Sequence, residues 1–299
     1  MNLALFDKPA ALAREDVARH RRIVGLGQAD LVAALGLAGM PLVRTLAALL
    51  AMPAAARFAR LVARLDDDVR QHGLAVAAAR ALPCFAAGLE VIDGEAVPSA
   101  GPLLVVANHP GLTDALALMT AIPRDDLLIL AAERALLAEL PAIRTHLITI
   151  GEERESRLAA LKQASRHLRR GGAILTFPGG GIEPDPALEG AALDLRRWSA
   201  SLELLARSAT GGQVVPALVS GVLGRPALAH PLVRLRRRPA DRRWLAALLQ
   251  VAWPSLHDRA VRLAFGRPVP MPGRNGDPAL VRRQVESQMV ELLRASRRS

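Results

Sequence analysis

The 299-residue sequence has no tyrosine, one cysteine and only two lysines, and aromatic residues make up 3% of it. The single cysteine, Cys84, excludes an intramolecular disulfide and a cysteine-based zinc site within one chain. Because aromatic side chains are so scarce, the core must be built from leucine, alanine and valine. Hydrophobic residues make up 51% of the chain, which excludes an intrinsically disordered protein.

Acidic residues are scarce in the last third of the chain. Residues 200–299 hold 17 basic and 6 acidic residues, so this third accounts for the whole net charge of +11. Lys8 and Lys162 are the only lysines, so the excess is arginine. An arginine-rich surface predicts a polyanionic partner: a nucleic acid, an anionic membrane or a phosphorylated small molecule.

The first 22 residues lack the uninterrupted apolar core of a secretory signal. The segment 31–56, in contrast, is apolar except for Arg44 and Thr45, and it contains Pro41 and Pro53. It is long enough to span a membrane, but an arginine at its centre costs about 2.5–3.5 kcal/mol on insertion scales. We therefore expect two short helices broken near Pro41, either at a membrane interface or as core helices of a soluble domain.

From about residue 88, short apolar runs alternate with helical patterns. Runs typical of buried strands cover residues 103–107, 127–130, 146–150, 173–177 and 214–219, with weaker candidates at 89–93 and 261–265. Helical patterns cover residues 113–121, 153–170 and 188–207, and a last helix is capped by Asp277 and begins at Pro278. This alternation predicts an α/β fold with a mixed, mainly parallel sheet flanked by helices. We expect a helical, membrane-docking region over residues 1–87 and the α/β domain over residues 88–299.

A histidine and an aspartate follow one of these predicted strands. Residues 108–114, Asn-His-Pro-Gly-Leu-Thr-Asp, come directly after the run 103–107 and open a predicted helix. Open α/β sheets bind ligands at the carboxyl ends of their strands. A turn would bring the carboxylate of Asp114 to the imidazole of His109, which fixes the tautomer and raises the basicity of the second nitrogen. On spacing alone, a capping aspartate and an ordinary buried histidine explain the pattern at least as well.

Glycines and an arginine follow two other predicted strands. The glycine-rich segment consists of Phe177, Pro178, Gly179, Gly180 and Gly181. Such a segment lets backbone N–H groups approach a ligand, where they can hold a phosphate or a developing oxyanion. Arg154 follows the run 146–150 and is suited to bind a phosphate or a carboxylate. The ordinary alternatives are a flexible loop for the glycines and a solvated first helical turn for Arg154. A strand that contains Pro216 shapes a pocket wall or lies at a sheet edge.

In this order, the segments 108–114, 150–154, 177–182 and 214–217 resemble the motifs of the glycerophospholipid acyltransferase family, to which lysophosphatidate acyltransferase belongs. The family has Asn-His, four residues and Asp, then an arginine motif, then Phe-Pro-Glu-Gly-Thr-Arg, then Val-Pro. The first motif matches in full. In the third, Gly179, Gly181 and Ile182 replace the family's Glu, Thr and Arg, which help to bind glycerol phosphate. The resemblance covers about residues 88–225.

The resemblance implies an O-acyltransferase that moves a fatty acyl group from acyl-CoA or acyl carrier protein to a hydroxyl of a glycerolipid or related lipid. His109 would be the general base and Asp114 the residue that orients it. Asn108, Arg154 and residues 177–181 would bind substrate. No Gly-x-Ser-x-Gly nucleophile motif is present, so no covalent acyl-enzyme is expected. We expect no metal and no cofactor.

Two alternatives remain open at this point: a non-catalytic lipid-binding or scaffold protein with the same fold, and a nucleic-acid-binding protein that uses its C-terminal arginines. An apolar segment that starts at Trp244 and ends at Trp253 adjoins these arginines, which are Arg234, Arg236, Arg237, Arg238, Arg242 and Arg243. That arrangement favours an anionic membrane surface over a nucleic acid, because no aromatic residues are interleaved with the arginines. We therefore expect no nucleic-acid partner, and a peripheral or partly inserted protein on the cytoplasmic face of a membrane.

Overall fold

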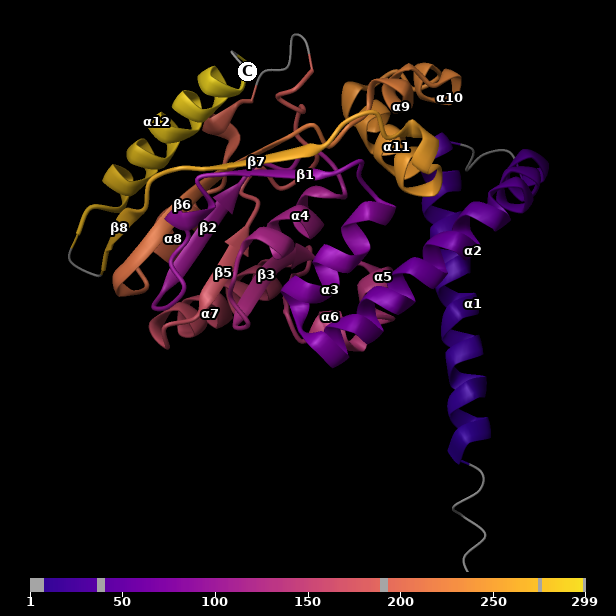
Figure 1. Ribbon diagram of the computed structural model, residues 1–299, viewed down its shortest axis with the longest axis horizontal. Helices are drawn as coiled ribbons and strands as arrows, with labels where there is room; N and C mark the ends of the chain where they lie inside the picture. The colour runs from indigo at the N-terminus through magenta and orange to yellow at the C-terminus, as the bar shows by residue number, and fades with distance from the viewer. Residues whose placement is uncertain (1–7, 37–40, 189–192, 274–275, 298–299) are drawn as a thin grey trace, which may run out of the picture.

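The computed structural model describes residues 8–36, 41–188, 193–273 and 276–297, and it has helices on both faces of one mixed sheet (Figure 1). The strands are β1 (Leu89–Ile92), β2 (Leu103–Ala107), β3 (Leu127–Ala132), β4 (Leu147–Ile150), β5 (Ala173–Thr176), β6 (Thr210–Ser220), β7 (Val261–Phe265) and β8 (Val269–Pro272). The long helices are α1 (Lys8–Leu35), α2 (Pro41–His72), α7 (Arg154–Arg169), α11 (Pro239–Ala252) and α12 (Pro278–Ser296). The shorter α-helices are α3 (Leu74–Ala81), α4 (Asp114–Ala121), α5 (Ala135–Ala138), α6 (Pro141–Arg144), α8 (Ser201–Ala206), α9 (Arg225–Ala229) and α10 (Pro231–Arg234). Single 3₁₀ turns are η2 (Leu82–Cys84), η3 (Gly94–Ala96), η4 (Leu195–Arg197) and η5 (Pro254–Leu256). The fold class predicted from the sequence is confirmed.

The strands follow the order β1-β7-β6-β2-β5-β3-β4, and β8 pairs with β6. All neighbouring pairs are parallel except those that β6 forms with β7 and with β8. The β8 pairing of β6 ends at Val214 and the β7 pairing begins at Ala217. Pro216 lies between the two, and its carbonyl accepts a hydrogen bond from Gly266 N at 2.8 Å on that same side. Its missing N–H is therefore not needed by either strand. The prediction of an edge strand is wrong, because β6 lies between β2 and β7, whereas the pocket wall stays a prediction.

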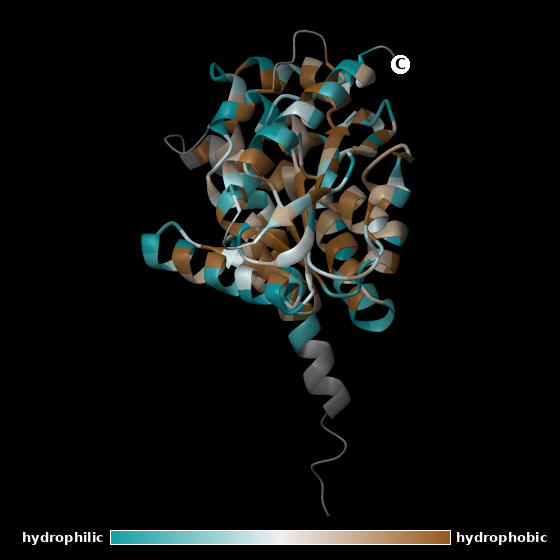
Figure 2. Ribbon diagram, turned by 90° about the vertical axis from the view of Figure 1, so that its left-hand side faces the viewer, coloured by the Kyte–Doolittle hydropathy of each residue, from teal (hydrophilic) through white to brown (hydrophobic). Residues whose placement is uncertain are grey.

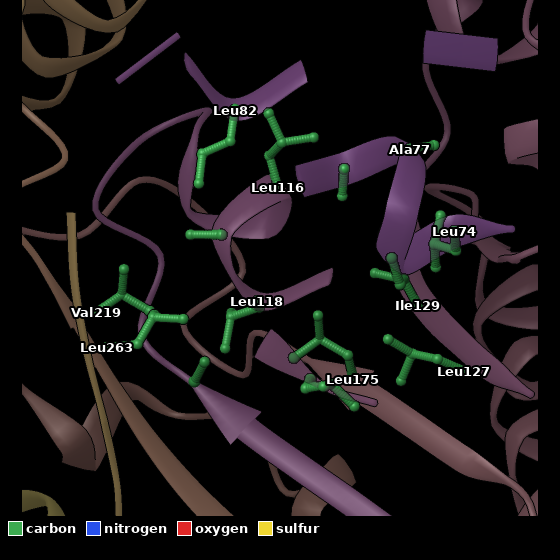
Figure 3. Packing of buried hydrophobic residues seen from close by; sticks show 14 of the residues in the cluster. Leu74, Ala77, Leu82, Leu116, Leu118, Leu127, Ile129, Leu175, Val219 and Leu263 are labelled. Carbon is green, nitrogen blue, oxygen red and sulfur yellow. The ribbon is translucent and has the colours of Figure 1, made fainter. Parts of the chain in front are cut away.

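Alternate residues of the central strands face opposite layers of helices. In β2, Leu103 and Val105 belong to the core shared with α3 and α4, while Leu104 and Val106 belong to the core shared with α7, α8 and α12. Figure 3 shows the first of these cores. The helices around the sheet carry both apolar and polar segments (Figure 2). Because both faces of β2 are covered, its sequence is apolar at every position, which is the pattern that predicted the strand.

The predicted helix over residues 188–207 is wrong. The described part of that segment, 188 and 193–207, holds only η4 and α8. The chain crosses the loop that follows β5: Trp198 Nε1 donates to Glu183 Oε1 at 2.9 Å, and Ser199 N donates to Pro178 O at 3.0 Å. A continuous helix would have used that backbone N–H internally. Strand β8 was not predicted, because it has four residues of which two are proline.

Other helix predictions agree closely with the structure. Helix α12 begins at Pro278, and Asp277 Oδ1 caps it by accepting from Ala279 N at 2.9 Å. Helix α7 lies within the predicted 153–170. Its buried residues are Ala160, Ala164 and Leu168, whereas Leu158 is 47% exposed.

Helices α1 and α2 pack side by side as a hairpin, and the start of α1 projects beyond the rest of the molecule (Figure 1). The two are separate helices, as expected, with α2 beginning at Pro41, but both are long rather than short. Asp66 joins them to the rest of the chain: it pairs with Arg19 of α1 at 2.7 Å and accepts from Ile143 N at 2.9 Å. Because residues of α1, α2 and the sheet share one core, the division at residue 88 stays a prediction.

Helix α2 contains the one segment in the described ranges that is long and apolar enough to cross a membrane, Thr45–His72. Only 22% of its most apolar 18-residue window is buried. Four leucines in the first half of α2 lie in solvent, namely Leu42, Leu46, Leu49 and Leu50. Together with Met52, which is also exposed, they form what we call the apolar face of α2.

Candidate active site

His109 and Asp114 form a hydrogen-bonded pair at the carboxyl end of β2. His109 follows the strand, and Asp114 is the first residue of α4. His109 Nδ1 lies 2.7 Å from Asp114 Oδ2. Since the carboxylate accepts, Nδ1 carries the proton and the lone pair of Nε2 is left free. The imidazole is 25% exposed and the Asp114 side chain is fully buried, so the pair can accept a proton from a group in solvent at Nε2 only.

Backbone groups hold the Asp114 carboxylate in place. Oδ2 also accepts from Gly111 N at 3.1 Å, and Oδ1 accepts from Ala115 N at 2.7 Å. Gly111 is required in this turn, because a Cβ there would lie 2.5 Å from Val222 Cγ1. The Pro-Gly sequence after His109 therefore shapes the turn that brings the two side chains together, as the sequence predicted.

The surroundings of His109 favour its charged form. Burial lowers the pKa of His109, but the charge of Asp114, its hydrogen bond and the charge of Glu183 together outweigh burial, so the pKa is raised. A raised pKa makes Nε2 a stronger base and stabilises the imidazolium that proton transfer creates.

Asn108 is bonded within the fold, and its predicted contact with substrate stays a prediction. It is fully buried, its Nδ2 donates to Val219 O at 2.9 Å, and its Oδ1 accepts from Val219 N at 2.7 Å. Both ends of the amide are used. The Asn108 side chain joins the end of β2 to β6, and so fixes the position of the backbone at His109, the next residue.

The glycine-rich segment lies beside His109, because β5 neighbours β2 in the sheet. The ring of Phe177 is 4.8 Å from the His109 ring. Gly180 has φ +70° and donates its N–H to Phe177 O at 3.1 Å, so it closes a tight turn and has no N–H to offer a ligand. The N–H groups of Gly179 and Gly181 have no partner among the described residues. These two are therefore the candidates for oxyanion donors, and Pro178, buried within the turn, has no N–H.

Glu183 is the residue of this segment that binds His109 most directly. Its Oε2 accepts from His109 N at 2.9 Å, and its own N donates to His109 O at 2.7 Å. Burial raises the pKa of the Glu183 carboxyl, and hydrogen bonds from Trp198 and the His109 backbone only partly counter it.

Arg154 is not brought together with His109. It is an exposed residue at the start of α7, after β4. Strand β4 lies three strands from β2 in the sheet, a separation of about 14 Å at 4.8 Å per strand. Arg154 and His109 share an edge of the sheet but lie on strands that are not neighbours, and the predicted role of Arg154 in substrate binding stays a prediction.

Two residues near the site had no assigned role in the sequence. Trp198 reaches Glu183 from a segment for which the pattern predicted a helix. The buried carboxylate of Asp185 accepts from the N–H groups of Gly221 and Leu223 at 2.9 and 2.8 Å, so it anchors the turn after β6. In the sequence, the only feature that could have drawn attention to Asp185 is its place between two prolines after the glycines.

No group of three or more histidine, cysteine, aspartate or glutamate side chains in the described part of the chain is placed to hold a metal ion.

Comparison with known proteins agrees with this geometry. The acyltransferase family model matches residues 88–220, which include β2, β5, β6 and both members of the His109–Asp114 pair. Among solved structures, the chain is similar to the 1-acyl-sn-glycerophosphate (LPA) acyltransferase PlsC from Thermotoga maritima, with 19% sequence identity, 80% of each chain covered and a TM-score of 0.49. The comparison with curated proteins gives no match. Residues 88–220, whose motifs around His109 resemble those of the glycerophospholipid acyltransferase family and meet at one edge of the sheet, therefore match an acyltransferase family model.

Proposed function

We propose that the protein transfers a fatty acyl group from an acyl thioester, acyl-CoA or acyl carrier protein, to a hydroxyl group of a lipid. The observation that carries the proposal is the His109–Asp114 pair at 2.7 Å within an acyltransferase-family domain. The His109 side chain is partly exposed, and Nε2 has no hydrogen-bond partner among the described residues, as suits a general base.

In the proposed step, Nε2 takes the hydroxyl proton while the hydroxyl oxygen attacks the thioester carbonyl carbon. The oxyanion forms beside the glycine-rich segment, where the N–H groups of Gly179 and Gly181 have no other partner in the described structure. The C–O bond forms, the C–S bond breaks, and the leaving thiolate takes the proton from His109. Asp114 stabilises the imidazolium between the two proton transfers.

The acceptor we propose has a weakly charged head group. Ile182 stands where the family motif has arginine, and it packs with α11 residues in an apolar cluster. A phosphate monoester would therefore lack that guanidinium, and it would lie near the Glu183 carboxylate. Losing one charge-assisted hydrogen bond costs about 1.5–3 kcal/mol, or about one to two orders of magnitude in affinity. We expect glycerol 3-phosphate to be a poor acceptor and lysophosphatidate at best a moderate one.

We also propose that the protein docks on the cytoplasmic surface of an anionic membrane through the apolar face of α2. Its exposed leucines at 42, 46, 49 and 50 follow helical spacing, so they lie on one side. The face spans about 16 Å at 1.5 Å per residue, which is about half of the ~30 Å hydrocarbon core. Partial insertion fits this length better than spanning.

Arginines adjoin that face. Helix α11 contacts both α1 and α2, and α10 packs against α11 (Figure 1). Leu235, just beyond the end of α10, is 75% exposed. Arg236 is committed to the fold: it pairs with Asp241 at 3.0 Å and its guanidinium lies against Gly36 at the end of α1. The arginines left for lipid head groups are Arg234, Arg237 and Arg238, which have no ion pair among the described residues.

The proposed function is tested by mixing the purified full-length chain with oleoyl-CoA and a panel of lipid acceptors. The panel holds glycerol 3-phosphate, lysophosphatidate, lysophosphatidylethanolamine and monoacylglycerol, and His109→Ala is the control. We expect acylated lipid and free thiol in equal amounts, with kcat/KM lowest for glycerol 3-phosphate. A folded protein that acylates no lipid from either oleoyl-CoA or oleoyl acyl carrier protein would favour a lipid-binding role. Lysophosphatidate as the best acceptor by a wide margin would show that Ile182 does not mark the phosphate position.

A further inference from the structure

The Glu183 carboxylate fills the space above Gly179. The backbone of Gly179 is not in the left-handed region, so a side chain is conformationally allowed there. A Cβ at that position would, however, lie 2.5 Å from Glu183 Cδ and 2.7 and 2.8 Å from its two oxygens. Glycine at 179 and glutamate at 183 therefore depend on each other.

From this position, Glu183 holds the main chain of His109 from both sides. The carboxylate accepts the His109 N–H at 2.9 Å, the Glu183 N–H donates to the His109 carbonyl at 2.7 Å, and Trp198 Nε1 fixes the second carboxylate oxygen at 2.9 Å. Asp114 acts on the imidazole ring, whereas Glu183 acts on the backbone that carries the ring. The two carboxylates thus have separate tasks.

We propose that Glu183 is a positioning residue for His109, whose carboxylate holds the His109 main chain from the space that a side chain at 179 would take and whose charge favours the imidazolium. This inference rests on the proposed role of His109 as general base. It also accounts for the glycine at 179: a carboxylate is present in that space, but it comes from four residues later in the chain.

The charged groups around this pair are few. Asp114 and Glu183 both raise the pKa of His109. Glu183 in turn feels His109, Asp114 and Arg243 of α11, and Arg243 Nε is buried without a hydrogen-bond partner. Asp185, two residues beyond Glu183, binds Ala187, Gly221 and Leu223 through its carboxylate. It does not touch His109, so Asp185→Asn is a matched control for removing a buried carboxylate from the same loop.

The first experiment is an NMR titration of the His109 imidazole in the purified full-length chain, with His109→Ala used to assign the signal among the seven histidines. Glu183→Gln keeps the side-chain size but removes the charge. We expect the His109 midpoint to move to lower pH in Glu183→Gln and to stay unchanged in Asp185→Asn. An unchanged midpoint in folded Glu183→Gln overturns the proposal. This titration needs no substrate, so its outcome is independent of the proposed function.

The second experiment moves the carboxylate back to position 179. Three variants are compared with the native chain: Glu183→Ala, Gly179→Glu, and the two combined. We expect each single change to lower kcat about 10–100-fold with oleoyl-CoA and the best lipid acceptor, because a misplaced base costs about two orders of magnitude. The combined variant should recover most of the lost kcat and restore the His109 midpoint.

The outcomes of the exchange are read together with circular dichroism. If folded Glu183→Ala retains native kcat and a native pH profile, Glu183 does not position His109. If the combined variant folds but is no better than Glu183→Ala in both kcat and the His109 midpoint, the space above Gly179 is not the place from which a carboxylate acts. If the midpoints shift as expected but no variant and no native protein acylates lipid, the positioning role stands and the proposed function fails.

Discussion

Two regions of the molecule treat their side chains in opposite ways: the edge of the sheet around His109 holds them in hydrogen bonds, and the surface formed by α2 with α10 and α11 exposes them to solvent. At the sheet edge, three polar side chains each have both terminal polar atoms in hydrogen bonds of about 3 Å or less; they belong to Asn108, Asp114 and Glu183. On the α2 surface, leucines lie in solvent, and Leu42 and Leu50 are 86% and 71% exposed. These side chains of the first region therefore find their partners within the chain, whereas the second region leaves apolar area and arginines for a partner outside it.

The difference separates two kinds of sequence requirement. Chemistry at one nitrogen depends on a few residues held at fixed distances, so single conservative changes there should have large effects. Adhesion to a lipid surface depends on total apolar area and charge, to which many residues contribute small and roughly similar amounts. The predictions that follow test whether the two regions respond independently.

The largest effect is expected at His109 and Asp114. His109→Ala removes the base and should lower kcat/KM about 10²–10⁴-fold, and Asp114→Asn should also lower it strongly because the amide cannot stabilise the imidazolium. Binding to vesicles should be unchanged in both. Acyl transfer and vesicle sedimentation are measured on the same preparations. Thioester consumption near the native rate in His109→Ala would rule out the proposed mechanism.

The second effect concerns the apolar face of α2. Leu46→Asp combined with Leu50→Asp should weaken sedimentation with phosphatidylglycerol vesicles about 100-fold, since burying one leucine contributes about 1.5–3 kcal/mol. The matched control is Leu158→Asp on α7, whose side chain is 47% exposed on another helix. Transfer to a soluble short-chain acceptor should persist in the double variant. If vesicle binding persists as well, the apolar face does not dock on the membrane.

The third effect is the pH dependence of transfer. His109 must be neutral to accept a proton, so kcat/KM should rise with pH through its pKa and then level off. Asp114 and Glu183 raise that pKa above the ordinary value of about 6.5, so the plateau should be reached at higher pH than for an unperturbed imidazole. Below the midpoint the rate should fall about tenfold per pH unit. Vesicle binding serves as the internal comparison, because arginines stay charged throughout. A plateau that begins below pH ~6 would contradict this picture.

The smallest effect is expected from the surface arginines. Replacing Arg234, Arg237 and Arg238 by glutamine should weaken binding to anionic vesicles by about 1 kcal/mol each, or about five-fold each. The loss should shrink as salt is raised, since the Debye length falls from about 10 Å at 0.1 M to about 3 Å at 1 M. The control is Arg169→Gln with Arg170→Gln; Arg169 is the last residue of α7, and Arg170 follows it. Equal losses per arginine in both sets would mean that net charge, and not this surface, attracts the lipid.

Most strands could be predicted because burial on both faces makes their sequences uniformly apolar. Strand β2 is the clearest case, with five buried residues in a row. The segment 188–207 could not be predicted, because its apolar residues enter the core between the sheet and helices α7 and α12 from a 3₁₀ turn and a short helix rather than from one continuous helical face. Its placement depends on Trp198 reaching Glu183, which is a contact between segments and not a local property.

At the site, the residues that are close in sequence were predictable and those that are distant were not. His109 and Asp114 are five residues apart, so a turn is enough to bring them together. The partner of Asn108 is a backbone group of Val219, and nothing in either segment indicates the pairing. The distance of Arg154 from His109 could not be predicted for a related reason: the sequence shows that Arg154 follows a strand, but only the strand order shows that two strands lie between that strand and β2.

The bond between Asn108 and Val219 also constrains the order in which the protein can acquire activity. The two residues are 111 positions apart, and β6 occupies the centre of the sheet beside β2. During synthesis, the histidine and aspartate leave the ribosome long before the strand that fixes their starting point. Closing so long a loop is slow compared with forming α4 locally. The geometry of the proposed active site is therefore a late product of folding, and shortened chains that end before residue 219 would contain His109 and Asp114 without the frame that aligns them.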